Sequence, residues 1–276
     1  MPIITLTTDF GEKDHFAGAV KGAIYSELKD IRIVDISHSI SPFHLTEAAY
    51  IIQNAYSSFP AGTIHIIGID SELNPENKHI AVYLNEHYFI CANNGIISML
   101  ASEINPEKIV EINIHDRSSS NFPVLDVFVK VACHIARGGT LEVIGKSVSE
   151  IKQLTGIRPV VNPDANQIIG NVIYIDNYGN VISNITKSLF DEIGKGREFK
   201  ITARTAIFTT VHTHYSDAIN FELPAEKREE DGKKLALWNS SGYLELSIYK
   251  SNPSTVGSAS TLFGLAYRDT ITVNFI

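Results

Sequence analysis

The sequence predicts an α/β N-terminal domain with a central, largely parallel sheet, followed by an all-β, barrel-like C-terminal domain. In the first half, strand-like runs alternate with segments whose apolar residues recur at helical spacing, which is typical of βαβ crossovers and a parallel sheet. In the second half, many short strand-like runs are separated by Gly, Asn and Pro turns, which is typical of a small antiparallel barrel or sandwich.

The first domain is predicted to cover residues 1–150. Asn85 and Glu86 lie between two apolar runs, so a hairpin is expected over residues 80–92. Gly138 and Gly139 predict the end of the helix that precedes them. The expected strands are residues 3–9, 31–37, 63–70 and 109–114, and the expected helices are residues 15–28, 45–59, 95–104 and 125–137.

Residues 151–166 contain two prolines and little periodicity, so this segment is predicted to be a linker. The C-terminal domain is then expected to cover residues 167–276 as an antiparallel β-barrel. Only the segment 187–194 within it has helical spacing.

The chain has 276 residues with 23 basic and 31 acidic side chains, a net charge of −8. Nucleic-acid partners are therefore not expected, since proteins that bind polyanions concentrate Lys and Arg. Cys91 and Cys133 both lie in apolar segments and are expected to be buried thiols, as in a reducing cytosol. There is no signal-peptide pattern and no apolar run of about 20 residues, so we expect a cytoplasmic protein without a membrane partner.

Three aspartates, Asp9, Asp35 and Asp70, each end a predicted parallel strand. One aspartate at such a place is better explained by capping of the next helix. Three of them, with Asp14 nearby, favour a ligand site, because ligands of open α/β sheets bind beyond the carboxyl ends of the strands. Asp9 is suited to accept hydrogen bonds from two ribose hydroxyls, and Asp14 is suited to face a cation.

The stretch YIDNYGNVISNI (174–185) turns through a similar set of polar residues in the second domain. An ordinary hairpin turn explains Asn and Gly there equally well. Tyr178 and Asn180 are also able to stack on a purine and hydrogen-bond it. His212 and His214 lie on one face of an expected strand, but no third ligand is evident, so no metal site is predicted.

Segments spread over nearly the whole chain carry a family resemblance. They are TTDFGEKDHFAGAVKG, IVDISHSISPF, CANNGIISML, YIDNYGNVISNI and NSSGYLELSI, in that order. The chain resembles the S-adenosylmethionine hydroxide adenosyltransferase family, adenosine-forming hydrolases related to fluorinase and chlorinase. The resemblance implies an α/β domain, a linker and a β-barrel domain. It also implies a homotrimer whose sites lie between the N-terminal domain of one subunit and the C-terminal domain of its neighbour.

The resemblance implies S-adenosylmethionine as substrate, with no cofactor, and displacement of methionine from the ribose 5′ carbon by water. Asp9 would hold the ribose hydroxyls. Asp14 and Asp176 would face the methionine end, with Asp176 at its ammonium and Ser240 at its polar tail.

By the same resemblance, Phe43 and Phe122 would form apolar walls. Tyr178 would stack near the adenine and Asn180 would hydrogen-bond it.

Two positions depart from the family's water-activating set of Asp, Arg and His. Asp70 remains, but Asn77 stands at the arginine position and Pro123 at the histidine position. Proline has no side-chain donor or acceptor, and asparagine lacks the charge of a guanidinium. Lys78 and His79 are the neighbouring candidates for a replacement, although an exposed lysine explains Lys78 as well.

These observations leave three hypotheses. The first is slow hydrolysis of S-adenosylmethionine to adenosine and methionine, with Asp70 acting on the water. The second is a non-catalytic protein that binds an adenosyl nucleoside. The third is an enzyme that acts on another adenosyl substrate.

Overall fold

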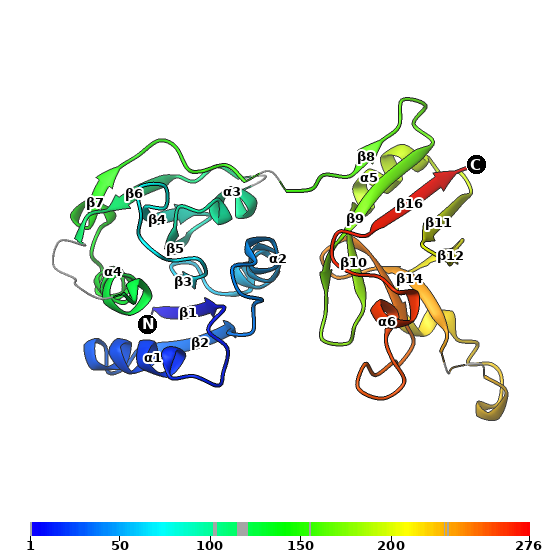
Figure 1. Cartoon of the computed structure of the whole chain (residues 1–276), viewed down its shortest axis with the longest axis horizontal. Helices are drawn as coiled ribbons and strands as arrows, with labels where there is room; N and C mark the ends of the chain where they lie inside the picture. Colours follow the sequence, from blue (N-terminus) through cyan, green and yellow to red (C-terminus); the bar gives the residue numbers. More distant parts are fainter. Residues whose placement is uncertain (1, 102–103, 115–120, 155, 229, 231) are drawn as a thin grey trace. The chain divides into compact units, whose positions relative to one another are not determined.

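The chain folds into two compact units, Met1–Gly156 and Ile157–Ile276 (Figure 1). The structure is a computed structural model and describes residues 2–101, 104–114, 121–154, 156–228, 230 and 232–276. The first unit combines a sheet with helices and the second is built mainly from strands, as the sequence predicts.

The first unit contains a seven-stranded sheet in the order β2-β1-β3-β5-β4-β6-β7. The pairs β2–β1, β1–β3 and β3–β5 are parallel, and the remaining pairs are antiparallel. The core of the sheet is therefore parallel, and antiparallel strands extend one side. The strands are β1 (Ile3–Thr8), β2 (Arg32–Ser37), β3 (Ile64–Gly68), β4 (His79–Leu84), β5 (His87–Ala92), β6 (Lys108–Ile112) and β7 (Gly145–Ser147).

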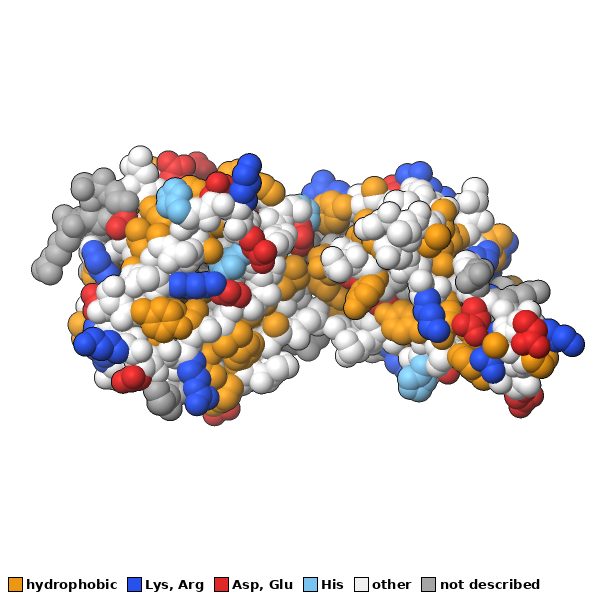
Figure 2. Space-filling view, turned by 90° about the horizontal axis from the view of Figure 1, so that it is seen from below, with side chains coloured by type: hydrophobic (Ala, Val, Ile, Leu, Met, Phe, Trp, Pro, Cys, Tyr) orange, Lys and Arg blue, Asp and Glu red, His pale blue; other side chains and the backbone are white. Residues whose placement is uncertain are grey.

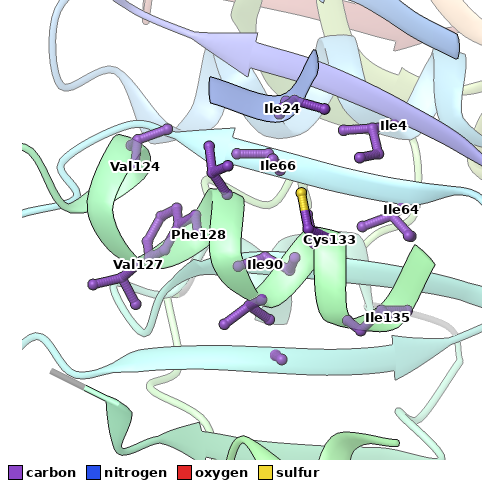
Figure 3. Close-up of a cluster of buried hydrophobic side chains, with 14 of the residues drawn as sticks. Ile4, Ile24, Ile64, Ile66, Ile90, Val124, Val127, Phe128, Cys133 and Ile135 are labelled. Atoms are coloured by element: carbon purple, nitrogen blue, oxygen red, sulfur yellow. The ribbon is translucent and has the colours of Figure 1, made fainter. Parts of the chain in front are cut away.

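Helices cover both faces of this sheet. One apolar cluster joins Ile64 and Ile66 of β3 to Ile24 and Phe128 (Figure 3), and a second joins Ile67 to helices on the other face. Successive strand residues point to opposite faces, and every residue of β3 is buried, so this strand is covered on both sides. The helices are α1 (Phe16–Glu27), α2 (Leu45–Ala55), α3 (Ile96–Leu100) and α4 (Val129–Ala136), with short helical turns η1 (Tyr56–Ser58), η3 (Val124–Phe128, a π-helical turn) and η4 (Leu141–Val143).

The predicted hairpin is confirmed, since β4 and β5 pair across Asn85 and Glu86. Both residues have positive φ, 50° and 63°, which is the backbone of a type I′ turn. The helix predicted over residues 95–104 is shorter, because α3 ends at Leu100. Cys91 and Cys133 are buried free thiols as predicted, and burial raises the pKa of Cys133 to about 11.

The second unit contains a nine-stranded sheet that curves around one apolar core (Figure 1). Its pairings are antiparallel except for β13–β14. β8 lies within the range 151–166 that the sequence presents as a linker. The strands are β8 (Val160–Val161), β9 (Gln167–Ile175), β10 (Val181–Thr186), β11 (Phe199–Ala203), β12 (Ala206–Phe208), β13 (Val211–His212), β14 (Lys234–Trp238), β15 (Tyr243–Ile248) and β16 (Thr270–Phe275).

The helices of this unit are few and short. They are α5 (Lys187–Gly194), α6 (Ala259–Phe263), η5 (Tyr215–Ala218) and η6 (Ala225–Lys227). The placement of His212 and His214 on one strand face was wrong. β13 ends at His212, whereas His214 is the N-cap residue of η5 and its backbone N–H donates to Asp217 Oδ2.

Charges on the surface are mixed in sign. On the face drawn in Figure 2, basic side chains are scattered among acidic and apolar ones. In the part of the chain that the structure describes, no helix is both long and apolar enough to span a membrane.

A buried histidine pair, His65 of β3 and His87 of the neighbouring strand β5, predicts a pH dependence of stability. His65 is 1% exposed, and its Nδ1 lies 2.7 Å from Thr5 Oγ1 while its Nε2 lies 3.1 Å from His87 Nδ1. Burial, with a smaller effect of His87, lowers the pKa of His65 to about 3. The folded protein thus keeps this imidazole neutral, whereas the unfolded chain protonates a histidine below about pH 6.5.

The free energy of unfolding should therefore be largest above about pH 6.5 and should fall as the pH decreases towards 3. The loss from this one group is at most about 1.4 kcal/mol per pH unit. Urea unfolding at pH 8, 6 and 4.5 measures it, with His65→Gln expected to flatten the dependence. His214→Gln, at an exposed histidine, is the control and should leave the slope unchanged. An equal slope in His65→Gln would show that other groups cause the dependence.

Candidate active site

A pocket of about 890 Å³ lies beyond the carboxyl ends of β1 and β3. Asp9 directly follows β1 and Asp70 follows β3, and both line the pocket together with Phe43 and Phe122. These four are sequence-predicted site residues from separate segments. The rule that parallel strands end at one edge explains why they meet.

Asp9 connects two loops at the mouth of this pocket. Its Oδ2 accepts a hydrogen bond of 2.9 Å from the backbone N–H of Phe43. That residue has a φ of 61°, which is unfavourable for a bulky side chain, and its ring is 72% exposed. Burial raises the pKa of Asp9, and the negative charge of Asp70 adds to the effect. The two carboxylates are therefore close enough to interact.

Asp70 has a left-handed backbone conformation, with a φ of 44°. Side-chain amides hold the backbone around it: Asn77 Nδ2 donates to Asp70 O at 2.8 Å, and Asn94 Nδ2 donates to Ile69 O at 3.0 Å. Asn77 is only 5% exposed. Asn77, at the expected arginine position, thus supports the backbone of this loop with its buried side chain.

The two neighbours suggested as replacements for that arginine lie elsewhere. Lys78 is exposed, and neither Lys78 nor His79 is among the described residues that line the pocket. His79 is fully buried, at the first position of β4, with its ring 4.8 Å from that of Phe128. Strand pairing and burial therefore fix His79 in the core.

Three phenylalanines form an aromatic wall beside the carboxylates. The ring centroid of Phe122 lies 5.4 Å from those of both Phe10 and Phe16, in edge-to-face geometry. Phe10 and Phe16 also line the pocket, although sequence reasoning did not select them. Their proximity to Asp9 in the chain was the available signal. A wall of this kind suits an apolar or aromatic portion of a ligand.

Pro123 follows Phe122 in the chain, lines the same pocket and is the N-cap residue of the π-helical turn η3. η3 approaches β3 closely, since a Cβ at Gly68 would lie 3.0 Å from Val124 Cγ2. Val124 is labelled at this end of the apolar cluster in Figure 3. The glycine therefore permits the contact that brings Pro123 to the pocket.

Asp35 is not at a strand end, contrary to the prediction. It lies inside β2, where its carboxylate oxygens are 2.5 Å from Lys21 Nζ and 3.1 Å from His38 Nε2. Burial alone would raise the pKa of Asp35, but these two partners outweigh it and lower the pKa. The Nδ1 atom of His38 also lies 2.7 Å from Thr8 Oγ1, so this network contacts the last residue of β1.

Asp14 is exposed in the loop between β1 and α1 and is not among the described lining residues of the pocket. The first unit alone thus does not bring Asp14 together with Asp9 and Asp70.

The remaining predicted residues lie in the second unit. Asp176 organises the turn between β9 and β10: its Oδ1 accepts from the N–H groups of Tyr178 at 2.9 Å and Asn180 at 2.8 Å. Its Oδ2 accepts from Asn180 Nδ2 at 2.9 Å. The Tyr178 side chain is 66% exposed at the tip of the turn. The carboxylate of Asp176 therefore links Tyr178 and Asn180 within one turn.

Glu245 was missed by sequence reasoning and lies beside this turn. It is 4% exposed and accepts hydrogen bonds from Tyr215 Oη at 2.6 Å and Ser247 Oγ at 2.7 Å. Burial raises its pKa, despite these donors and with a contribution from the charge of Asp176. Asn239 also bonds it, and Ser240 is exposed in the hairpin next to Asn239. A glutamate inside the apolar run YLELSI was the available signal.

Among the residues that the structure describes, no group of three or more His, Cys, Asp or Glu side chains is arranged to hold a metal ion.

Comparison with known families covers most of the chain. Residues 4–145 match the SAM hydroxide adenosyltransferase N-terminal domain, and residues 170–272 match the C-terminal domain of the same family. The chain belongs to the SAM hydroxide adenosyltransferase family. The resemblance drawn from the five sequence segments is thereby confirmed.

Individual relatives of this SAM hydroxide adenosyltransferase family member include named enzymes. An (R)-S-adenosyl-L-methionine hydrolase of Methanocaldococcus jannaschii is 30% identical, over 99% of this chain and 96% of the relative. A fluorinase of Actinopolyspora mzabensis is 24% identical, over 89% of this chain and 90% of the relative. A crystal structure of an uncharacterized conserved protein from Thermotoga maritima superposes with a TM-score of 0.82 at 25% identity, covering 99% and 100% of the two chains.

Proposed function

We propose that this protein binds S-adenosylmethionine and hydrolyses it to adenosine and methionine. The observation that supports the proposal most is the pocket in which Asp9 and Asp70 face an aromatic wall, in a chain of the SAM hydroxide adenosyltransferase family. Carboxylates attract a sulfonium cation, and an aromatic wall suits the nucleoside that carries it.

In this proposal Asp9 accepts hydrogen bonds from the two ribose hydroxyls. Its proximity to Phe43 N supports this role, because that bond fixes one carboxylate oxygen and leaves lone pairs for the ligand. Phe43 and Phe122 are the apolar walls of the nucleoside site.

The second unit supplies the rest of the proposed site. Tyr178 stacks near the adenine and Asn180 hydrogen-bonds it. Asp176 takes the ammonium of the methionine portion, Asp14 faces the same end, and Ser240 binds its polar tail.

The proposed assembly is a homotrimer with each site between neighbouring subunits. The proposed binding residues are distributed over two separate units, and this supports a site formed by two subunits. The partners are then S-adenosylmethionine and adenosine, without nucleic acid or membrane, the reaction uses no cofactor, and the protein works in the cytoplasm.

The chemistry is an in-line displacement. The oxygen of a water molecule bonds the ribose 5′ carbon while the carbon–sulfur bond breaks and its electron pair passes to sulfur. Methionine leaves as a neutral thioether, so the protein mainly has to align the water and accept its proton. Asp70 is the proposed acceptor, from its place at the end of β3.

A second candidate function is non-catalytic binding of an adenosyl nucleoside. Asn77 and Pro123 favour it, because neither supplies the charge or proton transfer of the arginine and histidine expected at these positions. Action on another adenosyl substrate is the corresponding catalytic alternative.

The purified protein should release adenosine and methionine from S-adenosylmethionine, at a rate orders of magnitude below that of a family member with the arginine and histidine. Each missing proton-transfer or water-orienting group typically contributes about 10²–10⁴-fold. Chromatography of the products measures the release, and calorimetry with adenosine measures binding. Binding without release would select the non-catalytic candidate, and absence of both would overturn the proposal.

A further inference from the structure

Three consecutive backbone carbonyls after β3 are each held by a buried side chain. Asn77 Nδ2 donates to Asp70 O at 2.8 Å and to Glu72 O at 3.1 Å. His79 Nε2 lies 2.8 Å from Ser71 O, and since a carbonyl only accepts, this nitrogen carries the proton. The exposed fractions of Asn77 and His79 are 5% and 0%, so residues 70–72 are anchored to the core.

This anchoring fixes where the loop places its side chains. Asp70, Ser71 and Glu72 all line the pocket, at the same edge of the sheet as Asp9. Because the backbone is held at each of these residues, the starting points of their side chains are fixed relative to the pocket, which reduces the entropy lost when the side chains bind a ligand. Glu76, four residues further along the same loop, is exposed and is not among the described lining residues.

The described lining of the pocket is acidic. It includes the carboxylates of Asp9, Asp70 and Glu72, and none of the described lining residues is Lys, Arg or His. Asp9 is engaged by Phe43 N and assigned to the ribose, which leaves Asp70 and Glu72 for the reacting end of the substrate. An attacking water here would meet two carboxylates and no described cation.

We propose that Glu72 is a second catalytic carboxylate, which holds the attacking water together with Asp70. This inference rests on the proposed hydrolysis of S-adenosylmethionine. Asn77 and His79 are positioning residues that fix the loop carrying both carboxylates. Asn77 thus has a role in this water site, although it lacks the charge of an arginine.

The two carboxylates suit the chemistry of the step. A water molecule that donates one hydrogen to Asp70 and the other to Glu72 directs an oxygen lone pair at the ribose 5′ carbon. As the new carbon–oxygen bond forms, the carbon–sulfur bond breaks and its electron pair neutralises the sulfonium. One carboxylate takes the water proton and passes it to solvent, so charge and atoms balance without a basic side chain.

The test compares Glu72→Gln with Glu76→Gln, which makes the same chemical change outside the pocket. Adenosine release at saturating S-adenosylmethionine gives kcat, its concentration dependence gives KM, and calorimetry gives the adenosine affinity. We expect Glu72→Gln to lower kcat about 100-fold, with KM and adenosine affinity within about twofold of the unmodified protein. Glu76→Gln should leave all three quantities unchanged.

A double variant adds a readout that a purely structural role would not give. If Asp70 and Glu72 act on one water, Asp70→Asn with Glu72→Gln should be little slower than Asp70→Asn alone, since groups acting as a unit are non-additive. Unchanged kcat in Glu72→Gln would overturn the role of Glu72 and leave the hydrolysis standing. A raised KM with unchanged kcat would also overturn it, by showing that Glu72 only attracts the cation. No release by the unmodified protein would overturn the hydrolysis and this water site together.

Discussion

Replacing Asp70 by Asn should lower the rate of adenosine release from S-adenosylmethionine by about 10²–10⁴-fold, the usual contribution of a group that takes a proton from the attacking water. Asparagine keeps the size of the side chain and tolerates the left-handed backbone of this position, at a φ of 44°. The variant therefore removes the charge with little strain. Product chromatography under single-turnover conditions measures the effect.

Binding separates this expectation from a folding defect. The adenosine affinity of Asp70→Asn should stay within a few-fold of that of the unmodified protein, because in the proposed site Asp70 faces the reacting end and Asp9 holds the ribose. Asp30→Asn, at an exposed aspartate outside the pocket, is the matched control and should leave the rate unchanged. A rate in Asp70→Asn equal to that of the unmodified protein would place the water-activating group elsewhere.

Replacing Asp9 by Asn should weaken adenosine binding by roughly 2–4 kcal/mol, because hydrogen bonds from two ribose hydroxyls to a charged acceptor are lost. The asparagine oxygen is still able to accept from Phe43 N, so the loop contact of 2.9 Å has a replacement. Asp9→Ala would remove the hydrogen bond to Phe43 N as well as those to the ribose, so a loss of affinity would not show which of them caused it. Calorimetry with adenosine measures the change.

The ribose hydroxyls provide the control for Asp9. With 2′,3′-dideoxyadenosine, the unmodified protein and Asp9→Asn should bind with similar affinity. Burial raises the pKa of Asp9, so adenosine affinity should decrease at a higher pH than for an ordinary aspartate as the medium is acidified. Asp9→Asn should lack this decrease. Equal adenosine affinity in both proteins would reduce Asp9 to a support for the Phe43 loop.

Much of the fold follows from local patterns. Strand-like runs and apolar residues at helical spacing predicted the strands and helices of the parallel core, and two residues with turn preference predicted the β4–β5 hairpin. The site was predictable in part for the same reason. Parallel strands end at one edge, so residues after β1 and β3 had to be neighbours, as Asp9 and Asp70 are.

Other features depended on contacts between distant residues. Asp35 is in a strand and not at its end, because Lys21 of α1 and His38 compensate its charge. His65 and Glu245 are buried polar residues whose partners, Thr5 and Tyr215, lie 60 and 30 positions away in the chain. No local pattern reports such a partner.

The sequence by itself determined the two-domain class, the family and the acids that meet at the edge of the parallel sheet. Only the tertiary structure decided which role Asn77 has at the arginine position and which further carboxylate lines the pocket. Asn77 became a buried support and Glu72 a pocket residue, although the sequence drew attention only to the first. The physical reason is that a polar side chain takes its role from burial and from the donors and acceptors around it, and both are fixed only when distant segments pack together.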